Sequence, residues 1–481
     1  MSAAASKDRI SALVEAKREK FIAVSDKIWG YSEIRFGLPQ SADEICRALE
    51  GEGFSVERGV ADMPHAFVAS FSNGKGPALG FLGEYDALAG LSQKADSAVR
   101  EPCAEGEPGH GCGHQALGAG SLAAATALKD YMKEAGLGGT VRYYGCPGEE
   151  SGSGKAYMAR AGLFSGLDAA LTWHPSIACR SMAMSSLANY QIYFHFKGIA
   201  AHAAAAPHLG RSALDAVELM NIGVNYLREH VIQEARIHYA LIDGGGHAPN
   251  VVQPKATSLY FIRAPKSSQV KDIYDRVVDI ARGAALMSGT ELSIEWDSAC
   301  AEVVPNATLS ELLYEKLNEI GPFDVTAEEE NYAARFVETL GAGGKERVLS
   351  NLVQTYGSSF AEKAKQIAAK SVTNDILPYY FTETAMPGST DVGDVSFNTP
   401  TGQIGVACFP NGTVEHSWQW VASGRSSICH KGMLLAGKVL ALAGAELLTD
   451  AELLAKANSE FRERTADNAY HCAIPPEVKP H

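Results

Sequence analysis

The sequence predicts an α/β protein in which an open mixed sheet forms a catalytic domain and an α+β unit is inserted into it. Over the first 187 residues, runs of β-branched and aromatic residues alternate with segments of helical period, the pattern of a sheet covered by helices. Between residues 188 and 299 the order becomes βαββαβ, as in a ferredoxin-like unit. We therefore expect a catalytic domain in two parts, 1–187 and 300–481, with an inserted lid or dimerisation domain at 188–299.

The expected elements of the first part follow in order. Apolar residues at helical spacing predict a helix at 9–29. The run Ser41-Ala-Asp-Glu44 has the spacing of a capping box and predicts a second helix that ends near Gly51. Further helices are expected at 115–137 and 155–161, and strands at 66–71, 78–82, 140–145 and 168–172.

The expected elements of the inserted unit are strands at 188–198, 237–243, 256–263 and 291–296, with helices at 211–230 and 268–287. After residue 301 helical patterns return, and a Glu-rich stretch near 328–370 is expected to be a helical insertion. A strand at 403–409 and a helix at 431–448 close the catalytic domain.

Composition limits the classes of partner. The net charge of −14 over 481 residues disfavours nucleic acid and anionic membrane surfaces. Nine scattered cysteines fit reduced thiols better than a disulfide framework. The N-terminus has no signal-peptide pattern, and we expect no apolar stretch long enough to span a bilayer. The expectation is a cytoplasmic enzyme with no membrane or nucleic-acid partner.

Polar residues stand at the carboxyl ends of three successive expected strands. Glu84 and Asp86 follow the first, the adjacent acids Glu149 and Glu150 follow the second, and His174 ends the third. In an open α/β sheet this edge is where ligands bind. A lone Glu-Glu pair is more often a solvated acidic turn, but three such loops on one edge make that interpretation much weaker.

The adjacent acids suit metal-assisted hydrolysis, because one carboxylate can bind a cation while its neighbour handles a proton. Cys112-Gly-His114 adds a thiolate and an imidazole two residues apart. Alone, that pair is more often a buried structural cysteine beside a loop histidine. Together with Glu150 and His174 it forms a set of N, O and S donors for a transition metal, and either His416 or His430 could complete a second site.

Several runs of the sequence resemble a known family. They are GEYDALAGL, GHGCGH, GEESGSGK, LTWHP, FKGIAAHAA, PHLGRSALDAV, PNVVQ, STDVGDVS and SICHKGMLLAGK. The chain resembles the dinuclear metallopeptidases that include aminoacylases and glutamate carboxypeptidases. Within them it is similar to the branch that hydrolyses hippurate and indole-acetyl-amino acids, which carries a Cys-Gly-His ligand motif. The resemblance covers nearly the whole chain.

The resemblance implies two divalent metal ions per subunit, Mn²⁺ or Zn²⁺. Cys112 would bridge them, His114 and His174 would complete one site, and Glu150 and His416 the other. His416 matches the family's position better than His430 does.

The resemblance also implies roles around the metals. Glu149 would be the general base and later the proton donor to the leaving amine. Asp86 stands where the family keeps an orienting carboxylate. Glu84 occupies the place of a histidine ligand in the wider family, and His114 takes over that duty in this branch.

Three residues of the inserted domain have roles only through the resemblance. His202 would reach a neighbouring subunit's site and stabilise the oxyanion, while Asn250 and Arg263 would hold the substrate's carboxylate. On the residues alone, an exposed loop histidine and asparagine and a strand arginine in a surface ion pair are the simpler interpretation.

The implied function is hydrolysis of the amide bond of a small N-acyl amino acid, with p-aminobenzoyl-glutamate favoured. Indole-acetyl-aspartate or an unusual dipeptide would use the same machinery. The enzyme would be a homodimer or a heterodimer with a paralogous subunit. Two hypotheses of another class remain: a non-catalytic partner subunit, which the intact Glu149-Glu150 pair argues against, and a metal-binding sensor, for which the sequence offers no output module.

Overall fold

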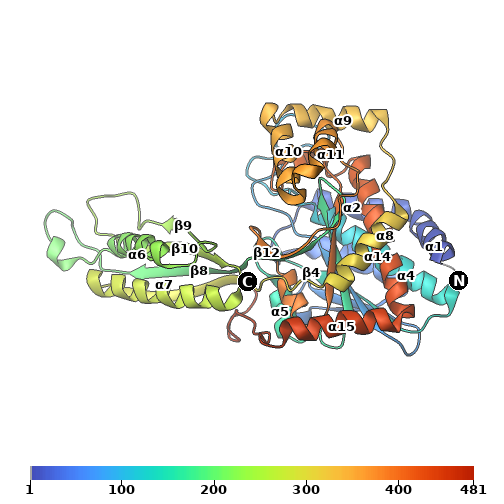
Figure 1. The fold of residues 1–481 in the computed structure, drawn as a ribbon. Helices are drawn as coiled ribbons and strands as arrows, with labels where there is room; N and C mark the ends of the chain where they lie inside the picture. Colours follow the sequence, from blue (N-terminus) through green and yellow to red (C-terminus); the bar gives the residue numbers. More distant parts are fainter. Residues whose placement is uncertain (1–2) are drawn as a thin grey trace.

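The computed structural model describes residues 3–481. A large region with a central sheet carries a smaller unit that projects to one side and a helical arm at its top (Figure 1). The central sheet has seven strands in the order β1-β2-β4-β3-β5-β13-β6. Its bounds are β1 (Ser55–Arg58), β2 (Phe67–Ser72), β3 (Ala78–Glu84), β4 (Thr140–Cys146), β5 (Ala169–Ser176), β6 (Arg180–Ser181) and β13 (Thr401–Ala407).

The middle of this sheet is parallel and its margins are antiparallel. β4, β3, β5 and β13 run in the same direction, so their carboxyl ends share one edge. β1, β2 and β6 pair antiparallel to their neighbours. The expected mixed-sheet α/β class is confirmed.

Helices cover both faces of the central sheet. They are α1 (Ala3–Glu15), α2 (Arg18–Tyr31), α3 (Pro39–Gly51), α4 (His114–Ala135), α5 (Gly154–Arg160), α8 (Ala307–Ile320), α12 (Val392–Ser396), α13 (Trp418–Ser423), α14 (Ser427–Thr449) and α15 (Ala451–Thr465). The largest apolar core lies between the sheet and α1, α2, α4, α8 and α14. This core fixes the strand ends that carry the polar residues.

One helix corrects an expectation about membranes. α14 is long and apolar enough to cross a bilayer by length and composition. However, 78% of its most apolar window is buried inside the protein, where the helix packs on α4 and β13. Its composition is therefore accounted for by burial in the core.

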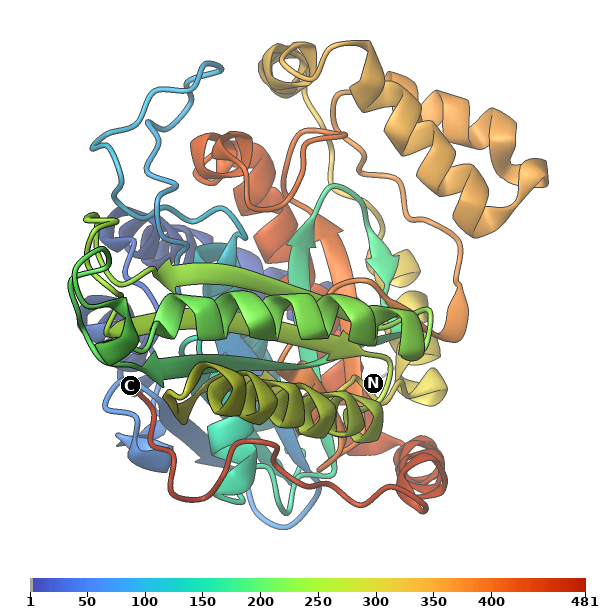
Figure 2. The same cartoon turned by 90° about the vertical axis from the view of Figure 1, so that its left-hand side faces the viewer.

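The projecting unit is a second, four-stranded sheet in the order β11-β8-β10-β9, antiparallel throughout. Its elements are β8 (Ala188–Lys197), α6 (Ala213–Leu227), β9 (Arg236–Asp243), β10 (Lys255–Ala264), α7 (Ser267–Ser288) and β11 (Glu291–Cys300). α6 and α7 pack together on the sheet (Figure 2). This is the βαββαβ order expected from the sequence, while the boundaries at 188 and 299 stay a prediction.

A group of three helices, here called the helical arm, stands at the top of the molecule (Figures 1 and 2). It consists of α9 (Ala327–Glu338), α10 (Ala342–Tyr356) and α11 (Ala361–Ala369). α10 and α11 share a small apolar cluster with Leu377. The Glu-rich stretch at 328–370 is therefore helical, and its status as an insertion stays a prediction.

Two helix boundaries differ from expectation, because contacts between residues distant in sequence determine where these helices begin and end. The helix expected at 9–29 is two helices, α1 and α2, and Lys17 between them pairs with Glu52 and with Asp130 at 2.6 Å. α3 begins at Pro39, so Ser41 lies inside the helix rather than capping it. The Glu33 carboxylate accepts the free N–H groups of that first turn instead.

The remaining strands were not expected from the sequence. β7 (Ala183–Ser186) and β12 (Phe381–Met386) pair with each other in a two-stranded sheet. β1, β6 and β7 have only two to four residues each, so they carry little periodic signal.

Candidate active site

The candidate site lies at the shared carboxyl edge of β3, β4 and β5, as the sequence predicts. Glu84 is the last residue of β3, Glu149 and Glu150 follow β4, and His174 lies in β5. β5 continues past the expected end at residue 172 to Ser176, which holds His174 in the sheet. The strand ends thus bring acids and an imidazole from distant parts of the sequence to one place.

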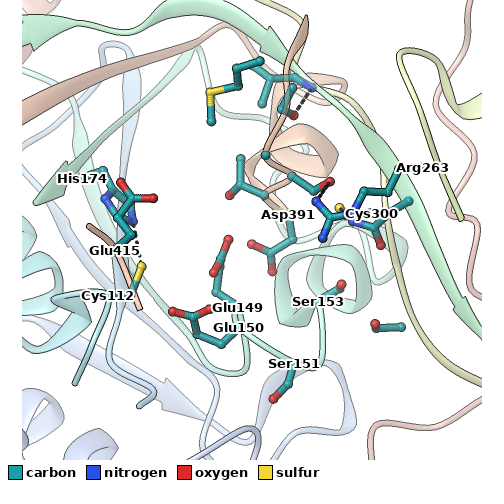
Figure 3. Close-up of a pocket in the computed structure, with 18 of the residues that line it drawn as sticks. Cys112, Glu149, Glu150, Ser151, Ser153, His174, Arg263, Cys300, Asp391 and Glu415 are labelled. Carbon is teal, nitrogen blue, oxygen red and sulfur yellow. Dashed lines mark hydrogen bonds between the residues drawn. The ribbon is translucent and has the colours of Figure 1, made fainter. Parts of the chain in front are cut away.

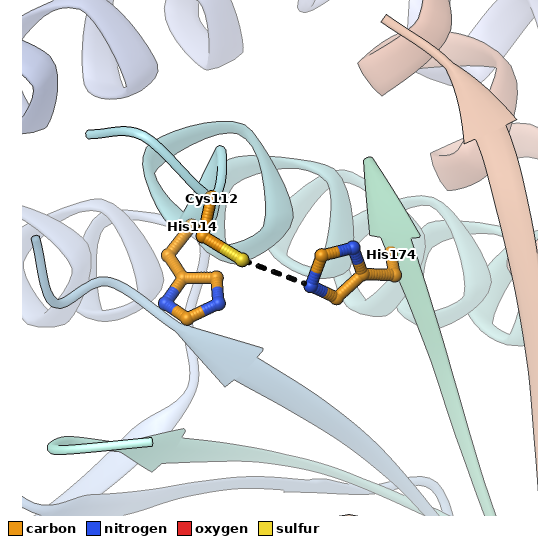
Figure 4. Close-up of side chains that lie close together, drawn as sticks. All are labelled: Cys112, His114 and His174. Carbon is orange, nitrogen blue, oxygen red and sulfur yellow. Dashed lines mark hydrogen bonds between the residues drawn. The ribbon is translucent and has the colours of Figure 1, made fainter. Parts of the chain in front are cut away.

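The Cys112-Gly-His114 run reaches this edge through a tight turn into α4. His114 is the first residue of the helix, and Gly113 before it has a φ of 87°. A Cβ on Gly113 would lie 2.9 Å from the Pro175 side chain. Only glycine meets both conditions without strain, so the short spacing places the thiol and the imidazole side by side (Figure 4).

The donor atoms form two trios that share Cys112. Cys112, His114 and His174 make the first, and Cys112, Glu150 and His416 make the second, with ligand atoms within 4.8 Å of one another in each trio. The Cys112 Sγ lies 3.5 Å from His174 Nε2. A further trio joins Glu84, His114 and Glu149. A thiol that lies within reach of both sets of donors has the position that a ligand bridging two cations requires.

Within residues 3–481, three buried polar atoms of the cluster have no hydrogen-bond partner: His114 Nε2, Glu84 Oε2 and Glu150 Oε1. His114 Nε2 lies 3.2 Å from Glu84 Oε2 and 4.0 Å from Glu150 Oε1. Buried polar atoms without a partner destabilise a fold. Cations coordinated among these N, O and S donors would satisfy them, so the residues fit a transition-metal site.

Asp86 holds two of the donors in place. Its Oδ1 lies 3.0 Å from His114 Nδ1, and its Oδ2 accepts the backbone N–H of Glu150 at 3.0 Å. The bond to Nδ1 leaves Nε2 of His114 facing the cluster. Such a carboxylate fixes the orientation of a metal-binding imidazole, and the orienting role of Asp86 stays a prediction.

The pKa values of the two adjacent acids, Glu149 and Glu150, shift in opposite directions. Burial raises the pKa of Glu149 well above its ordinary value, and the nearby carboxylates of Glu84, Glu150 and Asp391 add to the effect. Burial also acts on Glu150, but the imidazoles of His416 and His114 outweigh it and lower its pKa to about 2. Neighbouring carboxyls with divergent pKa values are typical of acids with different roles.

Burial and the carboxylates of Glu150 and Glu149 raise the pKa of the Cys112 thiol. The thiol therefore requires a bound cation to act as a thiolate, because a coordinating metal deprotonates it.

The structure separates the two candidate histidines near the C-terminus. His416 Nε2 lies 3.3 Å from Glu150 Oε2, inside the second trio. His430 lies in α14 and its Nε2 is 2.9 Å from Asp26 Oδ1 of α2. His430 belongs to no metal-binding trio among the described residues.

Two buried charges beside the cluster were not expected as functional residues. Lys155 is fully buried, and its Nζ lies 2.6 Å from both Glu84 Oε1 and Asp391 Oδ1. Lys155 and Asp391 lie in two of the runs that carry the family resemblance, GEESGSGK and STDVGDVS. Membership of these runs is the one feature of the sequence that could have indicated a functional role for them. Lys155 ties the Glu149 loop to Glu84 at the end of β3 and to Asp391 at the start of α12.

The cluster opens into a pocket of about 310 Å³ between the central sheet and the projecting unit. Figure 3 shows Glu149 and Glu150 between the side that carries Cys112 and His174 and the side that carries Arg263. Arg263 of β10 lies over the Phe261 ring at 4.1 Å, and its Nη1 is 3.5 Å from Ser389 Oγ. A guanidinium therefore faces the pocket of its own chain.

His202 and Asn250 do not line this pocket. They lie together in exposed loops, where the Ala203 N–H donates to the Asn250 carbonyl at 3.0 Å and His202 bridges to Val251. Most of β10 separates Asn250 from Arg263, a span of about 25 Å at the rise of a strand. Within one chain the structure does not bring Asn250 and Arg263 together.

Comparisons with known proteins agree with this geometry. A family model described as "Peptidase family M20/M25/M40" matches residues 80–417. One subunit of the p-aminobenzoyl-glutamate hydrolase of Escherichia coli (strain K12) is 47% identical over 467 residues, 97% of this chain and 97% of the relative. The Xaa-Arg dipeptidase of Mus musculus is 25% identical over 468 residues, 95% and 92% of the two chains. The solved aminobenzoyl-glutamate utilization protein from Klebsiella pneumoniae has a TM-score of 0.60 at 16% identity, over 90% of this chain and 97% of that one.

Proposed function

Because this chain belongs to peptidase family M20/M25/M40, we propose that it is a metal-dependent amidohydrolase that cleaves p-aminobenzoyl-glutamate to p-aminobenzoate and glutamate. The substrate assignment depends on the 47% identity, over 97% of both chains, to a subunit of a hydrolase that is named for p-aminobenzoyl-glutamate. The observation that supports the chemistry is the pair of donor trios that share Cys112 beside a raised-pKa carboxyl.

We assign two divalent cations to the trios, with Cys112 common to both. His114 and His174 complete one site, and Glu150 and His416 the other. The thiolate favours Zn²⁺, whereas the carboxylate tolerates Mn²⁺. Bound there, the ions would polarise the scissile carbonyl and acidify the attacking water.

The chain's own residues then move the proton. The Glu149 carboxylate takes it from the attacking water as the C–O bond forms, and returns it to the amide nitrogen as the C–N bond breaks. Asp86 keeps His114 oriented throughout. The lysine–carboxylate cluster of Lys155, Glu84 and Asp391 anchors the loop from which Glu149 projects.

A second polypeptide would complete the site. Arg263 would bind the substrate's carboxylate from its own chain, and His202 and Asn250 would enter the neighbouring subunit's pocket, where His202 stabilises the oxyanion. The partner is a second copy of this chain or a paralogous subunit. The similar Escherichia coli protein is named as one subunit of its hydrolase, which favours the paralogous partner.

The ligand assignment predicts different results for the two C-terminal histidines. His416→Ala is expected to lose at least half of the bound metal and most of the activity, because it removes one donor of the second trio. His430→Ala is expected to keep its metal, because the His430 side chain pairs with Asp26 of α2 and lies outside both trios of described residues. Elemental analysis of the two purified variants checks this. Normal metal content in His416→Ala would contradict the assignment.

The function itself is tested by p-aminobenzoate release from p-aminobenzoyl-glutamate. The purified chain is assayed after chelation and again with Zn²⁺ or Mn²⁺ restored, both by itself and together with a paralogous subunit. Activity that returns with one metal supports the proposal and identifies the working ion. Hydrolysis of indole-acetyl-aspartate or of a dipeptide, with p-aminobenzoyl-glutamate left intact, would overturn the substrate and keep the enzyme class.

A further inference from the structure

The active-site pocket does not end at the metal-binding residues. Arg180 and Glu415 line it, and both also line a second cavity of about 450 Å³. This second cavity lies under α10 of the helical arm, whose Val348, Leu352 and Tyr356 form part of its wall. The two cavities therefore adjoin at Arg180 and Glu415.

Arg180 reaches back over the sheet toward the active site. Gly405 of β13 pairs on one side with His174 of β5 and on the other with Arg180 of β6, so the two residues are about 10 Å apart across two strand spacings. A Cβ on Gly405 would lie 3.6 Å from Arg180 Cγ and 3.7 Å from its Nε, which is ordinary van der Waals contact. The arginine side chain therefore lies against the backbone of β13 at Gly405.

Within residues 3–481, the Arg180 guanidinium forms no ion pair. Its Nε is buried without a hydrogen bond to these residues, and none of their carboxylates lies within 4.0 Å of the group. Glu415 lines the same two cavities but forms no ion pair with it. The two Nη groups of Arg180 are not among the buried atoms without a partner, so they remain available to a ligand in the cavities. The preferred acceptor of such a planar group is a carboxylate bound by two parallel hydrogen bonds.

The second cavity has a lining that is about half apolar and half polar. The apolar side chains include Ile177, Leu352, Ile367, Leu377 and Trp420, and the uncharged polar ones are Ser176, Asn351, Thr355, Thr373, Asn411 and Thr413. Arg347 adds a second cation to a lining in which Glu415 is the carboxylate. The first pocket alone is at the small end of ligand sites, about 300–1,000 Å³, and the second cavity extends it.

We propose that the second cavity receives the distal part of the substrate's acyl group and that Arg180 binds a carboxylate on it. N-aroyl amino acids whose ring carries a carboxylate opposite the scissile carbonyl are then substrates alongside p-aminobenzoyl-glutamate, whose ring carries an amino group at that position. Arg263, on the other side of Glu149 and Glu150 in Figure 3, is left for the carboxylate of the amino acid. This inference rests on the proposed amidohydrolase function and names its acyl specificity.

The first test compares kcat/KM for 4-carboxybenzoyl-glutamate and 4-methylbenzoyl-glutamate. The wild-type enzyme is expected to favour the carboxylate substrate about tenfold or more, the size of a charge-assisted hydrogen bond. In Arg180→Met the ratio is expected to fall to about one, and in Arg180→Lys to lie between. An unchanged ratio in Arg180→Met would overturn the role of Arg180.

The second test uses a bulky side chain on α10 to fill the second cavity. Asn351 is exposed on α10 and lines the second cavity, whereas Gln354 is exposed on the same helix and does not. Asn351→Trp is expected to raise KM for 4-carboxybenzoyl-glutamate about tenfold with little change in kcat, and Gln354→Trp is the matched control. Equal kinetics in the two variants would show that the acyl group does not enter this cavity.

A binding measurement separates this inference from the proposed function. Calorimetry compares terephthalate with 4-methylbenzoate on the metal-loaded wild type and on Arg180→Met. If terephthalate binds more tightly than 4-methylbenzoate only when Arg180 is present, and no acyl-glutamate is hydrolysed, the proposed amidohydrolase function is rejected and the carboxylate site at Arg180 is retained. If acyl-glutamates are hydrolysed but neither kcat/KM nor affinity favours the ligand with a ring carboxylate, the amidohydrolase function is retained and the carboxylate site at Arg180 is rejected.

Discussion

Glu149→Gln is expected to lower kcat for p-aminobenzoyl-glutamate by about 10³- to 10⁴-fold, near the upper end of what a general base contributes, while the protein still binds both cations. The reason lies in the position of the side chain. Glu149 is absent from the two trios that share Cys112, so its amide form leaves both sets of donors intact. Glutamine keeps the shape of the side chain but cannot accept the proton of the attacking water.

The neighbouring acid provides the matched comparison. Glu150→Gln is expected to lose metal as well as activity, because Glu150 belongs to the second trio. Elemental analysis and initial rates on both variants separate a proton-transfer defect from a binding defect. A Glu149→Gln enzyme that retains kcat within tenfold of wild type would contradict the role of general base.

The same substitution is expected to stabilise the metal-free fold. Burial and the carboxylates of Glu84, Glu150 and Asp391 all disfavour the charged form of Glu149. At neutral pH the metal-free fold must therefore either protonate Glu149 or bury its charge, and both cost stability. A neutral amide avoids both, so the free energy of unfolding should rise by about 1 kcal/mol, a typical gain when an active-site conflict is relieved. Together with lost activity, this would identify Glu149 as a residue kept for chemistry at the expense of stability.

Much of the site could be predicted because it depends on local pattern. Three strands with recognisable periodicity must end on one edge if they are parallel, so the acids and His174 had to approach one another. The short spacing of Cys112 and His114 likewise constrains both to one turn. These features require no knowledge of how distant segments pack.

Other features depend on packing and are not visible in the sequence pattern. His416 and His430 both lie near the C-terminus, and packing separates them. His416 lies beside Glu150, whereas the placement of α2 gives His430 a partner in Asp26. The start of α3 depends in the same way on a carboxylate from Glu33. Arg180 lies in a two-residue strand that carries no periodic signal.

Lys155 shows this limit most clearly. A lysine in a run of glycine and serine normally indicates an exposed loop, yet this side chain is fully buried. Its partner Asp391 lies 236 residues further along the chain. Burial alone would lower the pKa of Lys155, but the carboxylates of Asp391 and Glu84 raise it well above its ordinary value, so the ammonium stays charged.

Lys155→Met is therefore expected to lower the free energy of unfolding by about 3–5 kcal/mol, the loss measured when one member of a buried charge cluster is removed. The methionine fills similar space but leaves Glu84 and Asp391 buried without their counter-charge. Lys197→Met is the control, because the Lys197–Glu291 pair is 76% and 78% exposed and such pairs contribute less than about 1 kcal/mol. Chemical denaturation of the metal-free proteins gives both values.

A triple variant distinguishes loss of charge balance from loss of packing. Lys155→Met combined with Glu84→Gln and Asp391→Asn removes all three charges, and the asparagine oxygen can still accept the Lys155 backbone N–H that Asp391 accepts at 2.9 Å. If unpaired charge is the cause, the triple variant is expected to recover most of the stability that the single variant loses, as neutral replacements of buried ion clusters do. A triple variant as unstable as Lys155→Met would mean that the lysine stabilises the Glu149 loop by packing, and the charge balance would have no part in it.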